Sequence, residues 1–228
     1  MGGRIIIGTR RYSSWSLRGW LPVRLAGLDV AEIVIPLAGG NTPAIRLLSP
    51  GGTVPLLDHD GQLIWESLAI GEYCAELQPR LWPADRAARA LARSVATEMH
   101  GGFRALRQAM PMSLFRQAKG AGRSPEALAD IARIEAIWRD CRQRFGAGGP
   151  YLFGADFTVA DAMYAPIVCR FLTYRPILSA ASLAYCHAVR AHPLIETWYR
   201  AAAAEPRAWY RADMEAPLRD EPPTAPPA

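Results

Sequence analysis

Two adjacent serines are the first side chains in this sequence with both the type and the position for chemistry. Ser13 and Ser14 follow residues 4–8 (RIIIG), an apolar run that predicts a buried strand, and they open the helix predicted next. Open α/β sheets bind ligands at the carboxyl ends of their strands, where this pair falls. A hydroxyl there can donate a hydrogen bond to a thiolate, and helix-terminal amides favour the thiolate over the thiol. Serines at a helix start are also common N-caps, so one can cap the helix while the other acts on a ligand.

An acid and a hydroxyl lie side by side at Glu66 and Ser67, at the start of a second predicted helix over residues 67–77. Ser67 has the residue type of an N-cap, and a helix N-terminus favours an anion such as a carboxylate. Glu66 can pair with an ammonium group. The two sites together suit the α-amino acid end of a small peptide, and the alternative is an ordinary helix cap beside a surface acid.

The step Thr53-Val54-Pro55 precedes a predicted strand. A proline at a strand start lacks the amide for a central ladder bond. A cis Val54–Pro55 bond would turn the N–H and C=O of Val54 outward, where they can pair with an extended peptide. Val-Pro alone favours the alternative, an edge-strand proline, because only about 5–6% of such bonds are cis.

The elements that position these residues form two groups. A strand, a helix and a second strand over residues 31–35 predict a parallel unit. A hairpin turning at Asp60-Gly61 and the helix over residues 67–77 follow. Helices are predicted beyond, over residues 86–110, 125–145, 158–174, 183–190 and 193–204. We therefore expect an α/β domain over residues 1–79, a linker at 80–84, an all-helical domain over 85–216, and a disordered proline-rich tail at 217–228.

Composition narrows the class of protein. Half of the residues are hydrophobic and 21% are charged, and the net charge of +5 comes from scattered arginines, which argues against nucleic-acid binding. No apolar stretch is long enough to predict a membrane span. The four cysteines form no CxxC pair and no metal-ligand spacing with histidine, so we expect free thiols, no metal and a cytoplasmic location.

Taken together, these motifs resemble the cytosolic glutathione transferase family over residues 4–210. The resemblance rests on the serine run, SPGGTVPLL, LIWESLAIGEYCAE and FTVADAMYAP, while YSSWSLR and EMHGGF are similar to zeta-type and related bacterial serine-type members. It implies a thioredoxin-like N-terminal domain, a helical C-terminal domain, a homodimer, and glutathione as co-substrate. It also implies that the enzyme joins glutathione to a hydrophobic electrophile, as in detoxification.

The resemblance also assigns roles to individual residues. Ser13 matches the serine that hydrogen-bonds the glutathione thiolate, with Ser14 as the alternative. Val54 and a cis Pro55 match the clamp on the cysteinyl part, with Thr53 beside them. The residues that match those holding the γ-glutamyl end are Glu66 and Ser67.

Three departures from the zeta pattern bear on the reaction. Trp15 stands where zeta members have Cys, Thr53 where they have Gln, and Thr173 where a substrate-binding Arg is expected, although Arg170 and Arg175 lie nearby. These changes favour conjugation. The alternatives are a glutathione-dependent cis-trans isomerase similar to maleylacetoacetate isomerase, and a non-catalytic binding module.

Overall fold

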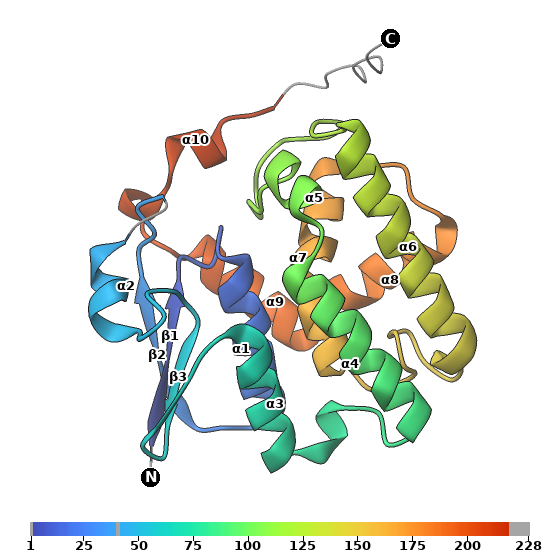
Figure 1. The fold of residues 1–228 in the computed structure, drawn as a ribbon. Helices are drawn as coiled ribbons and strands as arrows, with labels where there is room; N and C mark the ends of the chain where they lie inside the picture. Colours follow the sequence, from blue (N-terminus) through green and yellow to red (C-terminus); the bar gives the residue numbers. More distant parts are fainter. Residues whose placement is uncertain (1, 40–41, 219–228) are drawn as a thin grey trace.

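The computed structural model describes residues 2–39 and 42–218. Its N-terminal part is a four-stranded mixed sheet in the order β2-β1-β3-β4 (Figure 1). β1 and β2 are parallel, whereas β3 is antiparallel to both β1 and β4. This is the sheet that the predicted strand-helix-strand unit and hairpin require. The strands are Gly3–Gly8, Val30–Ile35, Leu56–His59 and Gln62–Ile64.

Helices cover both faces of the sheet. The bounds are Ser14–Leu25 for α1, Pro43–Leu48 for α2 and Ser67–Leu77 for α3. Figure 1 shows α1 and α3 between the sheet and the helical half, with α2 on the other side. Successive side chains of β1 point to opposite faces of the sheet, so this strand contributes to the core on each side. Ile5 and Ile7 join the main core, while Ile6 packs with Ile45 of α2.

The helical half is built around α7, Val159–Tyr174, which is buried over almost its whole length. It packs against α1 on one side and α4 on another. Around it lie α4 (Arg86–Gly101), α5 (Arg104–Ala109), α6 (Pro125–Phe145), α8 (Ala180–Arg190), α9 (Pro193–Ala203) and α10 (Ala212–Glu215). One-turn helices occupy Pro79–Leu81 and Arg207–Trp209. Within the described ranges, none of the helices is long and apolar enough to cross a membrane.

The single helix predicted over residues 86–110 is wrong, because the chain breaks between α4 and α5. Phe103 adopts a left-handed conformation with φ of 58°. A Cβ on Gly102 would lie 2.6 Å from the carbonyl oxygen of Glu98, so the turn requires glycine there. After the break, Arg107 of α5 donates back to the carbonyl of His100 at 3.0 Å.

The domain boundaries at residues 79 and 84 stay predictions. Most of the predicted disordered tail, residues 219–228, lies outside the described residues.

Candidate functional site

One cavity of about 220 Å³ gathers five of the seven predicted site residues. The lining residues are Trp15, Thr53, Val54, Pro55, Glu66 and Ser67. They come from the start of α1, the segment before β3 and the start of α3. The Val54–Pro55 peptide is cis, as the family resemblance implies, and the Trp65–Glu66 peptide is cis as well.

The N-terminus of α3 forms one end of this cavity. The sequence predicts Ser67 as the N-cap, but the structure corrects this. Glu66, with extended backbone (φ −94°, ψ −166°), takes the N-cap position, and Ser67 is the first helical residue. No side chain caps the helix, and the fully buried Ser67 Oγ has no hydrogen-bond partner within the described chain. First-turn amides and an unpartnered hydroxyl therefore meet at one point, which suits a carboxylate.

Glu66 contacts a histidine that sequence analysis did not select. The Nε2 atom of His100, at the end of α4, lies 3.2 Å from a carboxylate oxygen of Glu66. Burial lowers the pKa of His100, Glu66 opposes this, and the positive charges of Arg18 and Arg107 lower it further. His100 is therefore neutral at pH 7 and adds no positive charge beside Glu66, which can then pair with an ammonium group.

The two serines lie at the start of α1, beside the cavity but outside its lining. Ser13 is the N-cap, and its Oγ accepts from the Ser16 amide at 3.3 Å and donates to Ser16 Oγ at 2.7 Å. Ser14 Oγ accepts from Nη2 of Arg170 at 3.4 Å. Both serines are buried, at 6% and 7% exposed. Trp15, the next residue, is the one that reaches the cavity.

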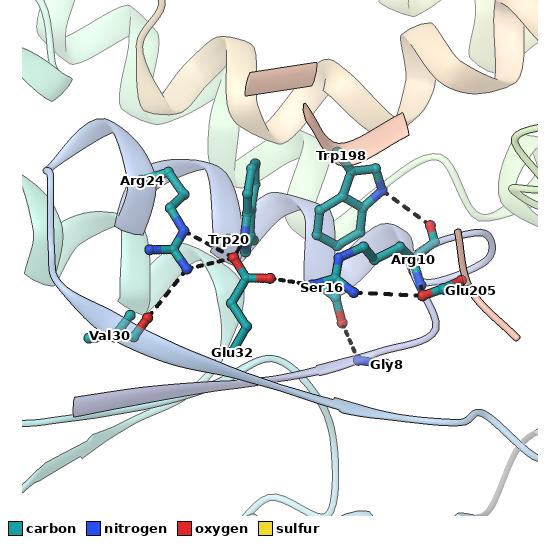
Figure 2. A network of polar contacts seen from close by, with 9 residues as sticks. All are labelled: Gly8, Arg10, Ser16, Trp20, Arg24, Val30, Glu32, Trp198 and Glu205. Carbon is teal, nitrogen blue, oxygen red and sulfur yellow. Dashed lines mark hydrogen bonds and ion pairs between the residues drawn. The ribbon is translucent and has the colours of Figure 1, made fainter. Parts of the chain in front are cut away.

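The loop that carries Ser13 is fixed by residues far away in sequence (Figure 2). The Glu205 carboxylate accepts from the amides of Arg10 and Arg11 at 2.7 and 3.3 Å. The indole of Trp198, on α9, donates to the carbonyl of Arg10 at 3.1 Å. At the loop's start, the amide of Gly8 donates to Ser16 Oγ at 2.9 Å. The helical half therefore sets where α1 begins.

Glu32 on β2 anchors the same network from the sheet. It accepts from the indole of Trp20 at 2.6 Å and from Nη2 of Arg24 at 2.5 Å, and it pairs with the guanidinium of Arg10. Burial alone would raise the pKa of Glu32, but these hydrogen bonds and the charge of Arg10 hold it below its usual value. Glu32 is therefore an ionised, structural carboxylate.

Comparisons with known proteins agree with this arrangement. The family model described as "Glutathione S-transferase, N-terminal domain" matches residues 12–77. The chain is 29% identical over 180 residues to maleylacetoacetate isomerase of Rattus norvegicus, covering 75% of this chain and 78% of that protein. It is 27% identical over 186 residues to glutathione S-transferase 3 of Zea mays, covering 79% and 80%. Residues 12–77 therefore match the N-terminal domain of glutathione S-transferases. A solved theta class glutathione S-transferase from Xanthomonas axonopodis pv. citri, with glutathione bound, is 28% identical with a TM-score of 0.57, covering 90% of this chain and 98% of that one.

The transferase domain matched by the family model contains all seven residues that the sequence predicted for the site. The glutathione transferase fold also brings in side chains that the sequence analysis missed. They are His100 against Glu66, and Arg18 and Arg107 against Trp15. Arg18 gave one available signal, because it directly precedes the apolar segment Gly19–Val23 of a helix predicted to pack on the sheet.

Proposed function

We propose that this protein conjugates the thiolate of glutathione to an electrophilic small molecule. The observation that carries the proposal is the cavity in which the Val54 backbone, Glu66 and the unpartnered hydroxyl of Ser67 meet. These groups match a γ-glutamyl peptide in charge and in hydrogen bonding. Relatives named as glutathione S-transferases, one solved with glutathione bound, support the same activity.

Each part of the peptide has a proposed holder. The γ-glutamyl carboxylate binds at the α3 N-terminus and Ser67 Oγ, and its ammonium group pairs with Glu66. The cysteinyl backbone pairs with the N–H and C=O of Val54, as an added strand does, with Pro55 fixing the turn. Thr53 offers a short hydroxyl beside them. The thiol then points toward the start of α1.

Ser13 is the proposed donor to the thiolate, and Ser14 is the alternative. In the structure Ser13 donates to Ser16 Oγ, so the Ser13 hydroxyl must rotate before it can donate to a ligand. Ser14 accepts from Arg170, which leaves its own proton available. Either hydroxyl would favour the thiolate. The sulfur then attacks the electrophilic carbon, a C–S bond forms, and the leaving group departs with its electron pair.

A spectroscopic titration tests the proposal and separates the serines. Bound thiolate gives an ultraviolet absorption band, which we expect in the wild type mixed with glutathione near neutral pH. Loss of the band in Ser13→Ala, with Ser14→Ala unchanged, supports Ser13. The opposite result assigns the role to Ser14. A wild type that binds glutathione without the band contradicts thiol activation.

Cis-trans isomerisation is a second candidate because the chain is 29% identical to the rat maleylacetoacetate isomerase. Trp15 counts against it, since a bulky ring replaces the small Cys of the zeta pattern. Turnover of maleylacetoacetate in the presence of glutathione would establish it. A non-catalytic binding module is the third candidate, and calorimetry that shows no glutathione binding at millimolar concentration would favour it.

The proposal includes a homodimer in the cytoplasm. Exposed apolar side chains on the N-terminal half, Leu47, Leu63 and Trp65, offer surface that a second copy can cover. Sedimentation would give the oligomeric state. All four cysteines are buried and unpaired, which suits a reducing compartment.

A further inference from the structure

Three arginines converge behind the start of α1, and the negative charge of Asp130 partly offsets the burial of one of them, Arg107. They are Arg18 on α1, Arg107 on α5 and Arg170 on α7. None of the three forms an ion pair within the described residues. The positive charges of the other two lower the pKa of Arg18, in addition to its burial, so the three are close enough to repel each other.

Arg18 is the most unusual member. It is completely buried, and its Nε donates to the carbonyl of Met163 at 2.8 Å. Its Nη1 and Nη2 have no hydrogen-bond partner among the described residues, and neither has Nε of Arg107. Burying a charged group without satisfying its donors is costly, and proteins generally satisfy such groups with a counter-charge.

The unpartnered donors belong to guanidinium groups that pack against the indole of Trp15, which lines the cavity. The guanidinium carbons of Arg18 and Arg107 lie 4.8 and 4.7 Å from the ring centre of Trp15. The indole forms part of the cavity wall, and neither arginine lines the cavity itself. Arg170 donates to Ser14 Oγ. The indole therefore separates the arginines from the cavity.

We propose that Arg18, Arg107 and Arg170 form an anion site that receives a carboxylate of the electrophilic substrate, with Trp15 moving aside as it enters. This rests on the proposed function and defines its substrate class. The two Nη atoms of Arg18 form the planar fork that pairs with a carboxylate through two parallel hydrogen bonds. The preferred electrophile is then a small carboxylate rather than a neutral apolar compound.

A matched pair of electrophiles tests the substrate class. In para-chloro-meta-nitrobenzoate and para-chloro-meta-nitrobenzamide, the glutathione sulfur forms a C–S bond at the chlorine-bearing carbon. Chloride leaves with its electron pair, and the thiol proton passes to solvent. Arg18→Met and Arg107→Met should each lower kcat/KM for the benzoate by about 10- to 100-fold, since a buried charge-assisted hydrogen bond is lost. Turnover of the benzamide should change little. Equal losses on both compounds would overturn the proposal.

Binding without glutathione tests the site independently of catalysis. We expect meta-nitrobenzoate, titrated by calorimetry, to bind the wild type and to raise its melting temperature, and to bind Arg18→Met at least about tenfold more weakly. Without ligand, Arg18→Met should melt higher than the wild type, because it removes an unsatisfied buried charge. Arg104→Met is the control, since Arg104 is exposed on the same short helix as Arg107.

The outcomes separate the two proposals. Arginine-dependent binding of meta-nitrobenzoate with no binding of glutathione would keep the anion site and reject the transferase. Equal binding of meta-nitrobenzoate to wild type and Arg18→Met would reject the anion site alone. Stabilisation by chloride equal to that by meta-nitrobenzoate would reject a carboxylate site. If Arg18→Met does not fold, Arg107→Met decides each comparison.

Discussion

At the scale of single residues, Ser67 combines complete burial with a hydroxyl that has no partner in the described chain. Ser67→Ala should weaken glutathione binding about tenfold or more, because a hydrogen bond to a carboxylate is lost. Its free energy of unfolding should stay within about 0.5 kcal/mol of wild type, since no internal hydrogen bond is removed. Calorimetry and urea unfolding measure the two effects. Ser94→Ala, an exposed change on α4, is the control. Unchanged affinity with lowered stability would mean that Ser67 is structural.

His100 predicts how glutathione binding depends on pH. Burial lowers its pKa below the usual 6.5, so His100 is neutral at pH 7 and becomes protonated only in more acidic solution. Protonated His100 then pairs with Glu66, 3.2 Å away, and competes with the ammonium group of glutathione. Affinity should be level above pH 6.5 and fall as the solution becomes more acidic. His100→Asn should remove that fall in calorimetric titrations. The same fall in the variant would assign it to another group.

At the scale of elements, α7 depends on a capping box between Thr158 and Asp161. Asp161 Oδ2 accepts from the amide and hydroxyl of Thr158 at 2.9 and 3.0 Å. Its Oδ1 accepts from the Leu152 amide and the Tyr185 hydroxyl, both at 3.0 Å. Asp161→Ala should lower the free energy of unfolding by roughly 3–5 kcal/mol in urea, because four donors lose a buried acceptor. Thr158→Ser keeps the hydroxyl of the capping box and should lower the free energy of unfolding far less. A small loss for Asp161→Ala would show that water replaces the carboxylate.

Elements could be predicted from sequence wherever the signal is local. The apolar run over residues 4–8 predicts a buried strand, and β1 forms there. The break between α4 and α5 could not be predicted, because phenylalanine rarely adopts the left-handed conformation of Phe103. The contacts of Glu66 with His100, and of Ser14 with Arg170, join distant segments, and no local pattern encodes them.

At the scale of the whole molecule, the end of the described chain returns to the loop that precedes Ser13. Glu215, on α10, accepts from Nε and Nη2 of Arg11, each at 2.9 Å, and from the hydroxyl of Tyr12 at 2.5 Å. The guanidinium carbon of Arg11 lies 3.9 Å from the ring centre of Tyr210. Burial alone would raise the pKa of Glu215, but the bonds from Arg11 and Tyr12 lower it, so it stays ionised. The C-terminal segment therefore helps to fix the serine loop.

Because Glu215 contacts the serine loop and not the cavity, its loss should affect kcat for conjugation more than KM for glutathione. Glu215→Ala should loosen residues 9–14 and lower kcat for conjugation about tenfold or more, because the donor to the thiolate is then less well placed. KM for glutathione should change little, since Val54, Glu66 and Ser67 lie on other elements. Amide hydrogen exchange of residues 9–14 should speed up in parallel. Asp213 lies on the same helix, and its side chain is 63% exposed. Asp213→Asn should therefore leave both kcat and the exchange rate of residues 9–14 unchanged. If kcat falls without faster exchange in that loop, Glu215 acts by another route than holding it.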